Sequence, residues 1–141
     1  MATPVTAGVL AMVGLAMVMD HGGMTQSLAE SASAAVGSAY PLVSGYVGML
    51  GAFTTGSNTN SNVLFGPLQM EMSRLLNLAA PWLLAAQTTG GALGSMIAPA
   101  KLIVGCAAVG IAGKDGLVFR RTAPYAALLG LAAGAMAWML A

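Results

Sequence analysis

Long apolar stretches alternate with short polar ones along the whole chain, and the lengths of the apolar stretches are those of helices that enter a membrane. A helix needs about 20 apolar residues to cross a hydrocarbon core of about 30 Å. Residues 3–19 form a first apolar stretch that ends at Asp20 and His21, and residues 122–141 form a 20-residue stretch at the end. The pattern predicts a transmembrane helix over each.

The segment between residues 25 and 77 is predicted to contain a connecting helix and a hairpin. Residues 25–40 are rich in Ala and Ser and too polar to span, which favours an interfacial or connecting helix. Residues 42–53 are apolar but would cover only about 18 Å as a helix. The polar run at 54–62 and a second helical stretch at 63–77 follow. Two part-length helices around a polar tip predict a re-entrant hairpin over 42–77.

A broken helix is predicted over residues 79–113. A half-length helix over 79–89 has Pro81 near its start, and residues 89–99 contain three glycines and end in Pro99. Glycine and proline loosen the backbone, and loosened backbone is tolerated at membrane depth only inside protein or along a cavity. Residues 100–113 then continue to the far side.

The loop before the last helix carries three basic residues, which predict a cytoplasmic position by the positive-inside rule; these are Lys114, Arg120 and Arg121. Within the last helix, Gly130 and Gly134 have the spacing that lets a neighbouring backbone approach closely. We expect these glycines to pack inside the chain rather than to form a dimer.

Composition supports a multi-pass, all-α membrane protein. Hydrophobic residues make up 57% of the chain and charged residues 6%, with a mean hydropathy of +0.81, whereas soluble domains have roughly 25% charged residues. The net charge of +1 argues against a nucleic-acid partner. No Ser/His/Asp arrangement, metal-ligand cluster or phosphate loop is evident, so the sequence predicts neither an enzyme nor a cofactor.

The predicted hairpin and broken helix together suggest a ligand site near the membrane midplane. Each break exposes helix amides at one side and helix carbonyls at the other. We expect an anion at the N-termini near residues 61–62 and 95–96, and a small cation at the carbonyls. Short hydroxyl and amide side chains suit this task without burying a formal charge. The candidate residues are Thr55, Gly56, Ser57, Asn58, Thr59, Asn60, Ser61, Asn62, Gln87, Thr88, Thr89, Gly90, Gly91, Ser95 and Lys101.

Three blocks of the sequence resemble the C-terminal part of the L-lactate permease family of bacterial transporters. They are "GAFTTGSNTNSNVLFGPLQ" (51–69), "AAQTTGGALGSMIAPAK" (85–101) and "GCAAVGIAGKDGLVFRRT" (105–122). The resemblance implies proton-coupled uptake of L-lactate and related 2-hydroxy monocarboxylates across the bacterial inner membrane. It also implies one half of an inverted-repeat transporter, with the rest of the permease or a second subunit as partner.

Two alternatives remain beside this interpretation. One is a sodium-coupled transporter of another organic anion with the same architecture. The other is a non-transporting membrane module that packs against a partner in the lipid bilayer. Dependence of uptake on a sodium gradient rather than on a proton gradient would distinguish the first alternative from a lactate permease. Absence of any uptake would distinguish the second.

Departures from the family pattern draw attention to the few charged residues of the middle segment. Many members have Asp where this chain has Asn58 and Lys where it has Ser95, while Lys101 replaces a small polar residue. Lys101 could return an ammonium group to the same carboxylate site, or extend along its helix toward the membrane surface. Glu71 and Arg74 are three residues apart and are expected to pair at a helix end.

Overall fold

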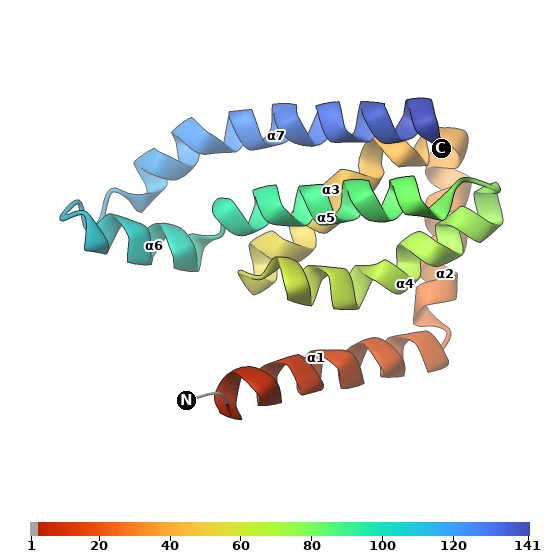
Figure 1. The fold of residues 1–141 in the computed structure, drawn as a ribbon, viewed down its shortest axis with the longest axis horizontal. Helices are drawn as coiled ribbons and strands as arrows, with labels where there is room; N and C mark the ends of the chain where they lie inside the picture. The colour runs from red at the N-terminus through yellow and green to blue at the C-terminus, as the bar shows by residue number, and fades with distance from the viewer. Residues whose placement is uncertain (1–2) are drawn as a thin grey trace.

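The protein is all-α in the part of the chain that the computed structural model describes, residues 3–141 (Figure 1). The helices are α1 (Thr3–His21), α2 (Met24–Val36), the 3-10 turn η1 (Gly37–Ala39), α3 (Tyr40–Thr55), α4 (Asn58–Leu76), α5 (Ala80–Met96), α6 (Pro99–Ala108) and α7 (Asp115–Leu140).

One helix of this part, α7, is long and apolar enough to cross a membrane by itself. Two further spans are possible if each of two bent helix pairs is counted as one. The first pair is α1 with the run from α2 to α3, bent by 68°, and the second is α5 with α6, bent by 46°. The re-entrant placement of the 42–77 hairpin and the inverted-repeat arrangement stay predictions.

The turn between α1 and α2 is made by two glycines. Gly23 has a φ of +70°, in the left-handed region that glycine adopts without a steric penalty. The predicted connecting helix over 25–40 corresponds to α2 and η1, which lead directly into α3. Pro41 lies in the first turn of α3, where its missing amide hydrogen costs nothing.

A short tip joins α3 to α4. Only Gly56 and Ser57 of the predicted polar run lie outside the helices, and residues 58–62 already form the start of α4. Gly56 ends α3 with a φ of +70°. The Ser57 hydroxyl then accepts a hydrogen bond from the Asn60 amide at 3.3 Å, which caps α4. The chain therefore reverses within two residues.

The predicted break over 89–99 is wrong in extent, because α5 stays helical through all three of its glycines. Only Ile97 and Ala98 separate α5 from α6. Gly90, Gly91 and Gly94 are buried; Gly90 and Gly94 face the backbone of α3, and Gly91 faces the Asn58 side chain of α4. Glycine costs about 1 kcal/mol in a helix on its own, but here tertiary packing against α3 offsets that cost.

The contact between α3 and α5 is a backbone-to-backbone contact. A Cβ at Gly90 would overlap the carbonyl of Gly45, and a Cβ at Gly48 would overlap that of Gln87. At the start of α3, a Cβ at Gly134 of α7 would overlap the Leu42 carbonyl. The close-approach glycines of the last helix are thus used inside the chain, as predicted.

The last helix begins earlier than predicted, at Asp115 rather than at residue 122. Arg120 and Arg121 therefore lie within α7 and not in a loop, and Lys114 immediately precedes it. Pro124 does not stop the helix. The cytoplasmic position of these basic residues stays a prediction.

Candidate functional site

The two chain breaks meet at one place. The Ser95 hydroxyl, near the end of α5, donates a hydrogen bond to the Gly56 carbonyl at the hairpin tip at 3.4 Å. Lys101, on the far side of the α5–α6 break, donates from its Nζ to the same Ser95 Oγ. The prediction that Lys101 could return to position 95 is thus matched by this contact. We call Gly56, Ser95 and Lys101 the break-crossing cluster.

A groove of about 310 Å³ runs beside this cluster, lined by residues 53–56 of the hairpin tip and residues 98–100 at the start of α6. Its walls come from the same two breaks that the cluster joins. The Lys101 ammonium donates to a neutral hydroxyl rather than to a carboxylate. Within residues 3–141 the ion pair that forms is Arg74–Glu71, so the charge of Lys101 is available to pair with an anion beside the groove.

The helix ends of the cluster differ from the prediction. Ser95 and Met96 lie at the C-terminal end of α5, so they present carbonyls rather than amides. Residues 61–62 lie in the second turn of α4, and the Ser61 amide already donates to Ser57 O at 3.1 Å. The first turn of α4, at Asn58 and Thr59, is where amide groups of the hairpin tip are left to bind an anion.

Three amide side chains of α4 carry buried oxygens without a hydrogen-bond partner. One is Gln69 Oε1, and the other two, near the hairpin tip, are the Oδ1 atoms of Asn58 and Asn62. These two residues are four apart and so share one face of the helix. Asn58 Oδ1 lies beside Gly91, where a Cβ would overlap it. Buried polar atoms are normally bonded, so a bare oxygen of this kind indicates a missing partner such as a ligand, an ion or water.

A chain of buried hydrogen bonds links α3, α4 and α5 below the tip. Gln69 donates to Gln87 Oε1 at 2.9 Å, and Gln87 donates to Ser61 Oγ at 3.2 Å. Ser61 in turn donates to the Gly48 carbonyl at 2.8 Å. All three side chains are fully buried, with exposures of 1% or less. Ser61 and Gln87 are therefore already bonded to protein.

Sequence reasoning missed Gln69, although a signal was present. It is an uncharged amide within the apolar part of the hairpin, and such a group must find a partner when buried. The neighbouring pair Glu71 and Arg74 does form the predicted ion pair, at 3.5 Å near the end of α4.

The remaining candidates have other roles in this structure. Thr88 and Thr89 are exposed on α5, and the Thr89 hydroxyl donates to the Ala85 carbonyl of its own helix. Gly90 serves the close packing against α3, and Gly91 leaves room for the Asn58 side chain. Thr55 Oγ1 donates to the Gly51 carbonyl at 2.7 Å and helps to end α3.

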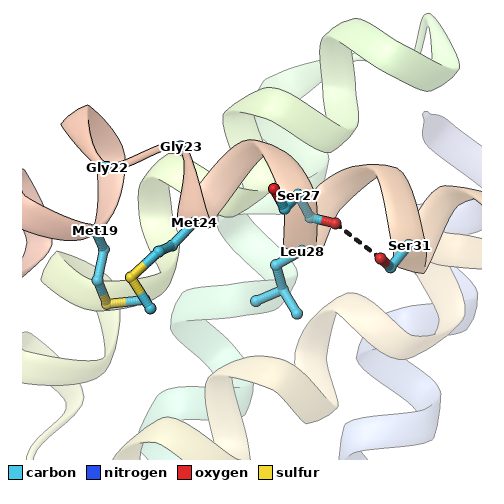
Figure 2. Close-up of a pocket in the computed structure, with 7 residues that line it drawn as sticks. All are labelled: Met19, Gly22, Gly23, Met24, Ser27, Leu28 and Ser31. Atoms are coloured by element: carbon cyan, nitrogen blue, oxygen red, sulfur yellow. Dashed lines mark hydrogen bonds between the residues drawn. The ribbon is translucent and has the colours of Figure 1, made fainter.

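A second cavity of about 440 Å³ lies at the turn between α1 and α2 (Figure 2). Met19, Met24 and Leu28 point into it, and the Ser31 hydroxyl is bonded to the Ser27 carbonyl at 2.8 Å. Its lining contains no charged side chain. A carboxylate would lose hydration in either cavity, but the groove at the two breaks ends at Ala100, next to Lys101, and is therefore the better anion site.

Comparison with known proteins identifies the family. The L-lactate permease family profile matches residues 1–141. The chain is 40% identical over 113 residues to the glycolate permease of Escherichia coli, 39% identical over 113 residues to the L-lactate permease of Salmonella typhimurium, and 38% identical over 121 residues to that of Bacillus subtilis. These matches cover 80–86% of this chain.

The chain spans about a fifth of the length of these relatives, 20% or 21% in each case. No solved structure matches it. The relatives are named permeases, which are integral membrane transport proteins rather than enzymes. With a match over its whole length and several relatives near 40% identity, this chain belongs to the L-lactate permease family.

Proposed function

We propose that this chain forms part of a secondary transporter that carries L-lactate and related 2-hydroxy monocarboxylates across the bacterial inner membrane, driven by protons. Its relatives are named for lactate and glycolate, which are both small 2-hydroxy monocarboxylates. Because the chain spans 20% of those proteins, the activity belongs to a larger assembly that includes the rest of a permease or a second subunit.

The break-crossing cluster is the observation that carries the proposal. A substrate carboxylate in the groove would replace the Ser95 hydroxyl as the acceptor of the hydrogen bond from Lys101 Nζ. The amides at the start of α4 would offer further donors to the same anion. Gly56 O and the Ser95 hydroxyl, freed from Lys101, could then bond the 2-hydroxyl group, which distinguishes these acids from simple carboxylates.

Replacing Lys101 tests this assignment in the complete permease reconstituted in liposomes. A charge-assisted hydrogen bond is worth about 1.5 to 3 kcal/mol, so Lys101→Met should raise the apparent Michaelis constant for lactate by about tenfold to a hundredfold. Ser95→Lys in the same background should recover part of the loss.

The matched control is Lys114→Met, because Lys114 is an exposed lysine beyond the end of α6. It should leave the Michaelis constant near that of the wild type. Unchanged kinetics in Lys101→Met would show instead that the side chain only extends toward the membrane surface. Failure of the Ser95→Lys rescue would remove the argument that position 95 and Lys101 serve one site.

A sodium-coupled carrier of another organic anion is the second candidate, and the unpartnered oxygens of Asn58 and Asn62 favour it. Neutral amide oxygens bind hard cations but cannot carry a proton at neutral pH. Uptake that depends on an imposed sodium gradient and not on a proton gradient would select this candidate. The absence of any gradient-driven uptake would favour a non-transporting module.

A further inference from the structure

We propose that the outward face of the N-terminal half of α7 binds the headgroup of an anionic phospholipid. This site is separate from the groove and from the transport proposal. It consists of Lys114 and Arg121, which supply positive charge, and of Leu117, Tyr125 and Leu128, which supply apolar contact.

These five residues share one helical stripe. Their spacings of three, four, four and three residues repeat at the period of an α-helix. Leu117, Tyr125 and Leu128 have exposures of 51%, 70% and 65%, and Lys114 and Arg121 are also exposed. The opposite side of α7, at Ala126 and Gly130, is buried against the rest of the protein. Figure 1 shows α7 along the edge of the helix arrangement, with its outer side uncovered.

The position of the basic residues along α7 matches the edge of a bilayer. Residues 122–140 follow Arg121 without another charged residue, and as a helix they extend about 28 Å. That length is close to the hydrocarbon thickness of about 30 Å. With this segment in the hydrocarbon core, Arg121 lies at the depth of the lipid phosphates, and Tyr125 lies just below them, where tyrosine is enriched.

The charge of this face is not cancelled by its acidic neighbour. Asp115 lines a cavity of about 210 Å³ with Phe53 and Phe119, and within residues 3–141 the ion pair that the structure shows is Arg74–Glu71, not one between Asp115 and Lys114 or Arg121. The guanidinium of Arg121 can bond a phosphate through two parallel hydrogen bonds. Arg121 therefore supplies a phosphate ligand, and Tyr125 and Leu128, on the membrane side of it, supply apolar contact for the acyl chain, while Lys114 and Leu117 lie on the headgroup side. A zwitterionic lipid would use this site less well because its headgroup has no net negative charge.

Native mass spectrometry of the complete permease in detergent tests the site. Phosphatidylglycerol and phosphatidylcholine with identical acyl chains are titrated as probes. Each basic side chain near a lipid surface is worth about fivefold in affinity for anionic lipid. We expect phosphatidylglycerol to bind about 25-fold more tightly than phosphatidylcholine, and Lys114→Gln with Arg121→Gln to abolish the difference.

Three further variants keep the test decisive. Arg74→Gln, which removes an exposed cation at the far end of α4, should retain the preference. Arg121→Lys keeps the positive charge and should retain most of the preference for phosphatidylglycerol. Lys114→Gln changes a residue just before the first residue of α7 and should lower that preference about fivefold. Equal binding of the two lipids, or an unchanged preference in the double variant, would overturn the proposal and indicate that protein covers this face.

Discussion

Replacing the two buried glutamines by methionine tests whether the hydrogen bond between them holds α4 against α5. Gln87→Met keeps the length of the side chain but removes the acceptor of Gln69 Nε2. The Gln69 amide then retains only its long contact to the Ser44 carbonyl, at 3.4 Å. Gln87→Met also removes the hydrogen bonds that Gln87 Nε2 donates to Ser61 Oγ and Ser61 O, at 3.2 and 3.4 Å. The Ser61 hydroxyl still donates to the Gly48 carbonyl, and the double-mutant cycle isolates the bond between the two amides.

The expected loss of stability differs between soluble proteins and membrane proteins. A buried polar group without a partner costs about 1 to 3 kcal/mol in soluble proteins. Hydrogen bonds between membrane helices average about 0.6 kcal/mol and reach about 1.7, because separated helices in lipid also find partners. The second range applies to a membrane protein. We therefore expect a coupling energy of about 0.6 to 1.7 kcal/mol between Gln69→Met and Gln87→Met.

The assay is a double-mutant cycle, with the free energy of unfolding measured by circular dichroism in mixed micelles of increasing sodium dodecyl sulfate. The double variant should lose less stability than the sum of the two single variants, because replacing both partners by apolar groups leaves neither unsatisfied. Gln26→Met is the matched control. Gln26 is exposed and bonded to Glu30, so its loss should change stability by less than about 0.5 kcal/mol. Additive single effects would refute the reasoning.

Two further predictions concern the packing and the tip. Gly90→Ala should destabilise the protein by about 1 to 3 kcal/mol in the same unfolding assay, since the added Cβ would overlap the Gly45 carbonyl. Gly105→Ala, at a position with open space around it, should not destabilise the protein. Equal stability of both variants would contradict the close contact. Asn58→Ala or Asn62→Ala in the complete permease should weaken substrate or ion binding by roughly tenfold, with exposed Thr88→Ala as the unaffected control; normal uptake kinetics in both Asn variants would leave the two oxygens with a structural role only.

Sequence reasoning worked best where one residue type has a local effect. The pairing of Glu71 with Arg74 and the return of Lys101 to Ser95 follow from spacing along a helix or across a break. The tip is predicted within the polar run at 54–62, but only Gly56 and Ser57 of that run lie outside the helices. The early start of α7 could not be read from the apolar pattern, because its first turns are polar and amphipathic.

Long-range packing explains what the sequence could not provide. The glycines of α5 weaken an isolated helix, and the sequence alone does not reveal that α3 lies against them. For the same reason the bend was expected among the glycines but occurs at Ile97 and Ala98, directly before Pro99. A residue before proline is disfavoured in the α conformation, and this local rule was the stronger signal. The partner of Gln69, 18 residues away, required the fold.

The glycine contact between α3 and α5 also limits how the protein can move. A shift of α5 along α3 by one helical turn, in the direction that carries Ala86 or Gln87 to the place of Gly90, would put a side chain where only a hydrogen fits. The two helices are therefore expected to move as one rigid body. Any motion that opens the groove to one side of the membrane would then be concentrated at residues 97–98, where α6 can rotate as a hinged arm and carry Lys101 away from Ser95. Release of the anion and movement of α6 would be the same event.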